Sequence, residues 1–580
     1  MRSSRTPALL LCIVLAQSIF LWRACEYSSA TPDEPGHLIA GIDYWQSGST
    51  HLYNVNPPLS KLWSTLPIAL NREVALPRLG SPFWDERQTR SEFVLGGRYL
   101  RQEGKNFMEQ LITARRMCAV FAVAGTLGVF CLAWIFSNTH AAFIAAVVWA
   151  FHPSTLSHGA ILGSDIPGAA MGCWAILASY LSLRRPTLVS LFWTGVLIGL
   201  AVLTKFTWLV AIPLWIFAVW WFETRLTEGK DAFFIKGYLS RVAVRVFGVL
   251  FVAWFVVCSG YRWHGMLEPL GEFRFVSNTL RGENENRFRI PLLSPIPALL
   301  PGDMIRGIDQ QWEDFDQPRW GYLNGQWQRG GWSWYYLNAL GVKLPLGSLL
   351  LFSIGAIVSR RNVPFLMVTL GPSATILLLI SLKTNMNEHT RYLWLILPLL
   401  IVLGASAIQA KTFVIRLLAI ILTSWSVYVG VVNFPCGLSY TNELLGGSRN
   451  AWRSLAGSNL DWDTEWIAIK KWMMITNQTQ NVAFAGYTLD GMQSAGLTVS
   501  SVIPSTFHDR VDVGEEIEVL LILPVDARLK LQRDYDFPTR TQQLQSEKIL
   551  CCTELYRVPL RSVRAIREIV WLDPNTPYSW

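Results

Sequence analysis

The chain has 580 residues, of which 51% are hydrophobic and only 16% are charged. This composition is too apolar for an ordinary soluble protein, and we interpret the chain as an α-helical polytopic membrane protein. The formal net charge of +9 fits basic loops beside a lipid bilayer. No long basic run is present, so we expect no nucleic acid as a partner.

Apolar runs of about 17–22 residues are long enough to cross a hydrocarbon core of roughly 30 Å. The first run could instead be a cleaved signal peptide, but its length and the lack of a clear cleavage site favour a span. We predict about eleven transmembrane helices, near residues 7–24, 117–136, 140–153, 166–183, 187–204, 206–222, 242–260, 344–358, 363–381, 392–409 and 413–433.

Basic residues in short loops stay on the cytoplasmic side of a membrane and therefore predict the orientation of the chain. With the N-terminus inside, five basic clusters share that side: Arg2 with Arg5, Arg184 with Arg185, the group Arg225, Lys230, Lys236 and Arg241, Arg360 with Arg361, and Lys411 with Arg416. The long loops 25–116 and 261–342 and the tail 434–580 then lie outside.

The sequence predicts two domains, a transmembrane module over 1–433 and a small extracytoplasmic α/β domain over 434–580. In the tail, hydrophobicity drops and short β-branched runs predict strands near 481–485, 497–503, 518–523 and 549–558, with a helix near 462–474. Four cysteines would face the outside, where a disulfide can form, but their pairing stays open: Cys25, Cys436, Cys551 and Cys552.

Two adjacent acids, Asp33 and Glu34, follow the first apolar segment, and His37 comes three residues later. On an isolated helix, an Asp N-cap with Glu in the first turn would be an ordinary stabilising arrangement. At the mouth of a membrane helix, beside a loop rich in Tyr, Trp, Asn and Pro, the acids instead indicate proton-transfer chemistry.

Further motifs occur in a fixed order along the predicted outer side. They are Asn-Pro-Pro-Leu-Ser-Lys61, Arg115 and Arg116 at the second span, Ser164-Asp165 at the fourth, Leu-Thr-Lys205 after the fifth, His389-Thr-Arg391-Tyr392, and the tail segment Ser458-Asn-Leu-Asp-Trp462. Together with Asp33-Glu34, this set resembles the GT-C glycosyltransferases of the dolichyl-phosphate-mannose protein mannosyltransferase and aminoarabinose transferase type. The resemblance covers roughly residues 7–470.

The resemblance implies a GT-C fold with external juxtamembrane helices and an inverting transfer of a sugar from a polyprenyl-phosphate donor to a hydroxyl acceptor on protein, lipid or glycan. It also implies a bacterial or archaeal cell membrane as the location. Such a reaction needs a base for the acceptor and cations for the departing phosphate. We expect Asp33 as the base, Glu34 assisting it, and Asp165 as a second acid.

The expected substrate-binding residues are His37, Lys61, Arg115, Arg116, Lys205, His389, Arg391 and Tyr392. Several have simpler alternatives: Lys205 could extend to the headgroups, either arginine of the second span could be an interfacial anchor, and Asp165 could be an N-cap. No cofactor is required by the motifs, although Asp33, Glu34 and Asp165 leave a divalent metal open.

Two other functions remain as alternatives, a lipid or solute transporter without enzymatic activity and a surface-glycan ligase or polymerase. Transporters place ionisable residues near the bilayer midplane, whereas the charged motifs here gather toward one membrane face. Neither the sugar nor the acceptor can be read from the residues.

Overall fold

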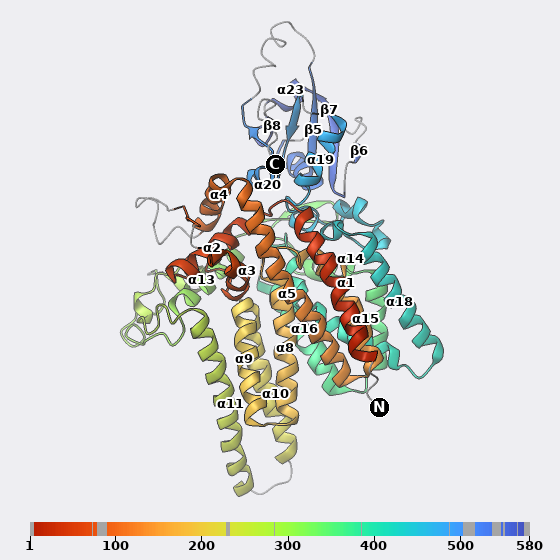
Figure 1. The fold of residues 1–580 in the computed structure, drawn as a ribbon. Coiled ribbons are helices and arrows are strands. Elements are labelled where there is room, and N and C mark those ends of the chain that lie inside the picture. Colours follow the sequence, from red (N-terminus) through yellow and green to blue (C-terminus); the bar gives the residue numbers. More distant parts are fainter. Residues whose placement is uncertain are drawn as a thin grey trace.

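The computed structural model of the chain consists mainly of helices, with a small β-sheet near the C-terminus (Figure 1). The sheet lies at one end of the helical bundle, opposite to the end where the chain begins (Figure 1). The structure describes residues 5–71, 74–77, 90–227, 232–283, 285–383, 385–478, 480–486, 488–502, 517–535, 547–548, 551–564 and 566–572. Arg2 and Lys230, two of the basic residues used to predict the orientation, lie outside these ranges.

All eleven apolar segments expected from the sequence form helices. They are α1 (Arg5–Tyr27), α5 (Lys105–Phe136), α6 (Thr139–Ala150), α8 (Asp165–Arg184), α9 (Leu188–Thr204), α10 (Ala211–Thr227), α11 (Ala232–Gly260), α15 (Leu346–Val358), α16 (Val363–Lys383), α17 (Leu397–Ala405) and α18 (Phe413–Val432). Within the described ranges, six helices are long and apolar enough to cross a membrane: α1, α5, α8, α11, α16 and α18. The bent pair of α14 (Tyr335–Lys343) and α15 would make a seventh span, and the remaining apolar helices are shorter. The chain is a multi-pass membrane protein.

Polar caps explain where two of the shorter apolar helices begin. Thr187 and Ser190 form a reciprocal capping box at α9, with each side chain bonded to the other residue's backbone N–H. At α6, the side chain of Asn138 accepts a 2.9 Å hydrogen bond from the N–H of Ala141. Each cap satisfies helix N–H groups that would otherwise have no partner, so both helices can follow tight turns.

The helices α9 and α11 pack closely because two glycines of α9 face α11. A Cβ atom on Gly195 would lie 2.7 Å from Cβ of Val252, and a Cβ on Gly199 would lie 2.8 Å from Cβ of Val256. Small residues four positions apart let two membrane helices approach each other at backbone distance.

Replacement of Gly199 by Val is therefore expected to force α9 and α11 apart and to lower stability by about 1–3 kcal/mol. The measurement is the melting temperature of the purified protein in detergent, followed by intrinsic fluorescence. Gly248→Val is the matched control, because a Cβ added to Gly248 on α11 would have no atom of the described chain within 4 Å. Equal melting temperatures for the two variants would contradict this account of the packing.

Short helices and turns connect the bundle at the end near the sheet. They are α2 (Glu34–Ser47), α3 (Leu59–Ala69), α4 (Ser91–Glu103), α7 (Pro153–His158), η2 (Phe206–Val210), η3 (Leu270–Glu272), α12 (Asn278–Arg281), α13 (Gly302–Asp316) and η4 (Thr390–Leu395). A two-stranded hairpin of β1 (Trp320–Leu323) and β2 (Gln326–Arg329) lies in the loop before α14. Figure 1 shows α2, α3 and α4 beside one another at this end. At the opposite end, η5 (Ser406–Gln409) follows α17 and packs against the end of α15, where the hydroxyls of Ser406 and Ser359 lie 2.8 Å apart.

The first part of the tail consists of turns, and the sheet forms only after it. The turns are η6 (Cys436–Leu438), η7 (Glu443–Leu445), η8 (Ser448–Arg453) and η9 (Gly457–Asn459). A disulfide joins Cys436 to Cys551, which selects one pairing among the four cysteines expected outside. This bond ties the start of the tail to the sheet, and disulfides persist in oxidising compartments.

The C-terminal sheet has six strands in the order β4-β8-β3-β5-β7-β6. Its elements are α19 (Trp466–Thr476), β3 (Val482–Phe484), α20 (Leu489–Ser494), β4 (Val499–Ser500), β5 (Glu518–Pro524), α22 (Val525–Tyr535), β6 (Glu547–Lys548), β7 (Thr553–Pro559), α23 (Leu560–Val563) and β8 (Val570–Leu572). Helices α19 and α20 cover one face, and α22 and α23 cover the other. The central strand β5 is buried over all residues but its first, as expected for a strand covered on both faces.

The strands predicted from sequence lie at β3, β4, β5 and β7, and the predicted helix near 462–474 corresponds to α19. Residues 503 and 549–550 of the predicted strands lie outside the described residues. Strands β6 and β8 were not predicted, because two or three residues are too few to show an alternating pattern.

Candidate active site

Two ion pairs meet around the ring of Tyr392 at the end of the bundle where the short helices gather. Arg391 donates a 2.8 Å hydrogen bond from Nη1 to Oδ2 of Asp33, and Lys205 donates from Nζ to Oδ1 of Asp165. Lys205 Nζ lies 5.0 Å from the centroid of the Tyr392 ring, and the Arg391 guanidinium carbon lies 5.9 Å from it. The structure therefore brings two acids and two cations, predicted from four separate motifs, into one site.

The backbone at Lys205 explains how an ammonium group reaches this place. Helix α9 ends at Thr204, Lys205 is extended, and the chain re-forms a helix as η2. Lys205 is 4% exposed and lies against Asp165 in the first turn of α8. Its side chain is therefore directed into the protein and does not extend to the lipid headgroups.

The neighbouring backbone of α8 is held by Trp208 of η2. The indole Nε1 of Trp208 donates a 2.7 Å hydrogen bond to the carbonyl of Gly168. A Cβ on Gly172 would lie 1.8 Å from Cζ2 of Trp208, so only glycine leaves room for the ring. This contact keeps the first turns of α8, and with them Asp165, in register with Lys205.

Asp33 does not serve as the N-cap of α2, although it precedes that helix. Its side chain makes no capping hydrogen bond, and its carboxylate faces Arg391. Burial alone would lower the pKa of Arg391, but the carboxylates of Asp33 and Asp165 raise it on balance. Arg391 is thus a permanent cation between two acids.

The tail motif holds the loop that carries Arg391. Asn459 accepts a 2.7 Å hydrogen bond from the backbone N–H of Thr390 and donates to the hydroxyl of Tyr335. Nδ1 of His389 lies 2.7 Å from the hydroxyl oxygen of Ser458. The sequence singled out this tail segment without giving its residues a role, and its contacts now show one.

Trp462 also supports Arg391, because its ring lies against the guanidinium group. The Arg391 guanidinium carbon lies 4.2 Å from the centroid of the Trp462 ring. A cation over an aromatic face is worth about 0.5–2 kcal/mol, more when water is excluded. The ring thus orients the guanidinium toward Asp33.

Replacement of Trp462 by Leu is expected to raise KM for a substrate bound by Arg391 roughly tenfold, because about 1 kcal/mol or more of cation–π attraction is lost and the guanidinium is less well oriented. Trp462→Phe should recover part of the loss, because a smaller aromatic face remains. Once a turnover assay is in hand, the measurement is KM for the substrate. Trp134→Leu, on an exposed indole of α5, is the control, and equal KM values for all three variants would contradict the role of the ring.

Glu34 is buried and saturated with hydrogen bonds, in contrast to Asp33 beside it. Its two oxygens accept from Nε and Nη2 of Arg115 at 2.7 and 2.6 Å, and from the backbone N–H groups of Leu162 and Thr31 at 2.8 and 2.9 Å. The remaining donors of Arg115 bind the carbonyls of Cys25, Ser28 and Ser29. Both side chains are 0% exposed, so this pair joins α1, α2, α5 and the turn before α8.

Arg116 lies elsewhere, although it follows Arg115 in sequence. Its guanidinium stacks 3.6 Å from the ring centroid of Trp22 and pairs with Glu26, both on α1. Its side chain is 27% exposed. The structure thus separates two arginines that the sequence could not distinguish, and Arg116 has the surroundings of an interfacial anchor.

His37 and Lys61 lie next to the site, around Tyr53. The rings of His37 and Tyr53 are 4.4 Å apart, and Lys61 Nζ donates to the carbonyl of Tyr53. Burial lowers the pKa of His37 to about 3, with Lys61 adding to the effect, so this imidazole is neutral at physiological pH. Burial also lowers the pKa of Lys61 to about 7, against the raising influence of Glu92 and Asp303.

Lys61 also borders a pocket in the first external loop region. Besides Lys61, its lining includes the polar side chains of Tyr44, Thr50, Asn54, Asn56 and Tyr261. The Tyr261 hydroxyl is buried and has no hydrogen-bond partner among the described residues. Tyr53 begins the stretch that ends in the Asn-Pro-Pro-Leu-Ser-Lys61 motif, but the sequence assigned no role to Tyr53 or to Tyr261.

The structure also places His158 of α7 near Asp165 and Trp394. Its ring lies 5.8 Å from that of Trp394. Burial lowers its pKa to about 3, while the charge of Asp165 acts in the opposite direction. None of the sequence motifs included this histidine.

The three acids considered for a divalent metal do not form a common ligand set among the described residues. Asp33, Glu34 and Asp165 each pair with a different basic side chain. This arrangement favours a site built for an anion that can exchange with a carboxylate.

The fold and the site define a multi-pass membrane protein with a buried, charged centre at one end of its helices. Residues 106–255 match the family model described as dolichyl-phosphate-mannose-protein mannosyltransferase. This match confirms the resemblance to GT-C glycosyltransferases that the sequence motifs indicate. No curated protein sequence matches the chain.

Two solved structures illustrate the similarity. ArnT from Cupriavidus metallidurans bound to undecaprenyl phosphate has 11% identity and a TM-score of 0.43, with coverage of 96% of this chain and 98% of that chain. The Archaeoglobus fulgidus oligosaccharyltransferase tethered with an acceptor peptide has 13% identity and a TM-score of 0.40, with coverage of 81% of this chain and 57% of that chain.

Proposed function

We propose that the protein transfers a sugar from a polyprenyl-phosphate donor to a hydroxyl acceptor, with inversion at the anomeric carbon. The observation that supports this most directly is the site around Tyr392, where Asp33 faces Arg391 and Lys205 Nζ lies 5.0 Å from the centroid of the Tyr392 ring. A carboxylate beside two cations offers both a base and a phosphate clamp. The family-model match over 106–255 is consistent with this chemistry.

Arg391 and Lys205 bind the donor phosphate in this proposal. A guanidinium fork suits phosphate oxygens, and an ammonium supplies a second positive charge. In the structure, carboxylates pair with both cations. Arrival of the phosphate draws Arg391 from Asp33, and the carboxylate becomes free to accept a proton.

Asp33 then acts as the general base. Its carboxylate takes the proton of the acceptor hydroxyl while the acceptor oxygen forms a bond to the anomeric carbon. On the opposite face of the sugar, the bond between that carbon and the phosphate oxygen breaks. The electron pair leaves with the polyprenyl phosphate, whose charge Arg391 and Lys205 stabilise. A single displacement needs one carboxylate, whereas a retaining reaction would need a second as nucleophile.

Several other residues of the sequence motifs hold this centre in place. Asp165 holds Lys205, the pair of Glu34 and Arg115 fixes the start of α2, and Ser458, Asn459 and Trp462 hold the Arg391 loop. Lys61 borders the neighbouring pocket with a pKa lowered to about 7 by burial, so an incoming anion would restore its positive charge. We assign it to contact with the donor or acceptor.

We place the site on the extracytoplasmic face of a bacterial or archaeal cell membrane, with the N-terminus in the cytoplasm. Basic loops on the opposite side and the Cys436–Cys551 disulfide support this orientation. Single cysteines introduced at exposed Leu444 and Arg361 should react with impermeant reagents from outside and inside, respectively. Reaction of both from the same side would contradict the orientation.

The transferase proposal is tested by incubating the purified protein with isotope-labelled polyprenyl-phosphate sugars and membrane extract. Mass analysis should find the label moved to a protein, lipid or glycan, with polyprenyl phosphate released in equal amount. Binding of the donor without any transfer, across a panel of sugars and extracts, would argue for a transporter instead.

A further inference from the structure

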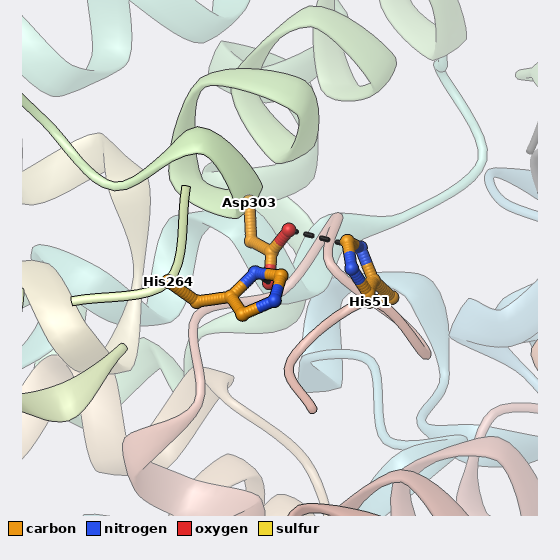
Figure 2. Close-up of side chains that lie close together, drawn as sticks. All are labelled: His51, His264 and Asp303. Atoms are coloured by element: carbon orange, nitrogen blue, oxygen red, sulfur yellow. Dashed lines mark ion pairs between the residues drawn. The ribbon is translucent and has the colours of Figure 1, made fainter. Parts of the chain in front are cut away.

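Two histidines and a buried acid from three separate segments converge outside the site around Tyr392. His51 follows α2, His264 follows α11, and Asp303 lies in the first turn of α13. Figure 2 shows both imidazole rings directed at the Asp303 carboxylate. Nδ1 of His51 lies 2.9 Å from Oδ1, and Nδ1 of His264 lies 3.2 Å from Oδ2.

The donor atoms of these three residues all lie within 4.8 Å of one another. Zinc binds imidazole nitrogen and carboxylate oxygen at about 2.0–2.2 Å, so the ligand atoms around a tetrahedral ion lie about 3.4 Å apart. The two contacts between a histidine and Asp303, at 2.9 and 3.2 Å, are only slightly shorter. Both imidazoles are 44% exposed, whereas Asp303 is 0% exposed. The buried carboxylate and the open imidazoles leave a coordination position for water.

The surroundings of Asp303 fit a metal ligand. Oδ1 is buried, and it forms an ion pair with Nδ1 of His51 at 2.9 Å. The hydroxyl of Thr50 donates to Oδ2 and fixes the orientation of the carboxylate. Metal ligands commonly have such a supporting hydrogen bond.

Arg306 is a basic side chain beside the cluster, and it is largely committed elsewhere. It donates to Glu268 at 2.6 and 2.7 Å, whereas its Nη1 lies 3.7 Å from Oδ1 of Asp303. Two protonated histidines would repel each other across a ring separation of 4.7 Å. A metal cation bound between the two neutral rings removes that repulsion.

We propose that His51, His264 and Asp303 bind a divalent transition-metal ion, with Zn²⁺ the best fit to two imidazoles and one carboxylate. The ion ties the loop after α2 to the turn after α11 and to α13. Thr50, which supports the ligand Asp303, also lines the pocket that contains Lys61. The metal would thus stiffen the loop that carries this pocket.

The test uses the full-length protein in detergent, stripped with chelator and then titrated with Zn²⁺ alone. We expect one Zn²⁺ per chain by elemental analysis and a rise in melting temperature on binding. His51→Gln and His264→Gln should lose the bound metal and the melting shift. Because both rings are half exposed, these variants should remain folded, which gel filtration checks.

Two further variants sharpen the test. Thr50→Val removes only the supporting hydrogen bond and should weaken Zn²⁺ binding about 10–100-fold. His140→Gln, on an exposed histidine of α6, should bind as the wild type does. Failure of the wild type to bind Zn²⁺, or equal binding by the His51→Gln and His264→Gln variants, would overturn the proposal whatever the result of the transfer assay.

Discussion

Asn in place of Asp33 is expected to reduce turnover about 10²–10⁴-fold, the usual contribution of a general base. The amide keeps the size of the side chain but cannot accept the acceptor proton. Donor binding should persist, because the substitution frees Arg391 from its carboxylate partner. The measurements are kcat in the transfer assay and Kd for the polyprenyl-phosphate donor.

Asp43→Asn provides the matched control for this variant. It makes the same chemical change within α2, the helix that Asp33 precedes, at a half-buried residue that pairs with neither Arg391 nor Lys205 in the described part of the chain. Unchanged turnover in Asp33→Asn would remove Asp33 from the role of base. Loss of donor binding together with turnover would indicate that Asp33 positions Arg391 and does no more.

Much of the helical architecture could be predicted because each membrane helix carries its signal locally. Apolar length predicted all eleven apolar helices, and Lys205 stood out because a charged residue between two apolar runs needs an anion. The β-branched runs predicted β5 and β7, whose buried patterns follow from their own residues. These predictions depend on segments of about 20 residues or fewer, within which the physical cause is contained.

Pairings between distant segments could not be predicted in the same way. Glu34 and Arg115 are 81 residues apart, and only packing of α2 against α5 decides that Arg115 turns inward while Arg116 faces Trp22. The partner of Cys436 depends on how the sheet sits on the bundle. His51, His264 and Asp303 come from segments with no metal-binding spacing, so the sequence contained no sign of their convergence.

Replacement of Glu34 by Gln is expected to cost about 3–5 kcal/mol of folding stability, the effect of leaving a buried charge without its partner. The two Glu34 oxygens accept four hydrogen bonds, and an amide NH₂ in place of one oxygen would face two donors. Arg115 would retain its carbonyl contacts but lose its counter-ion. The measurement is the melting temperature and the yield of monodisperse protein.

Glu26→Gln is the control that the chain itself offers, because Glu26 pairs with the adjacent Arg116 at the surface. Exposed ion pairs contribute about 0–1 kcal/mol, so this variant should melt close to the wild type. Arg115→Met combined with Glu34→Gln should be more stable than Glu34→Gln alone, since the unpaired charge is gone. The opposite result would be a Glu34→Gln variant that melts like Glu26→Gln but loses turnover to the extent expected for Asp33→Asn. In that case Glu34 takes part in the chemistry, and the assignment of Asp33 as the base and Glu34 as a structural partner of Arg115 is wrong.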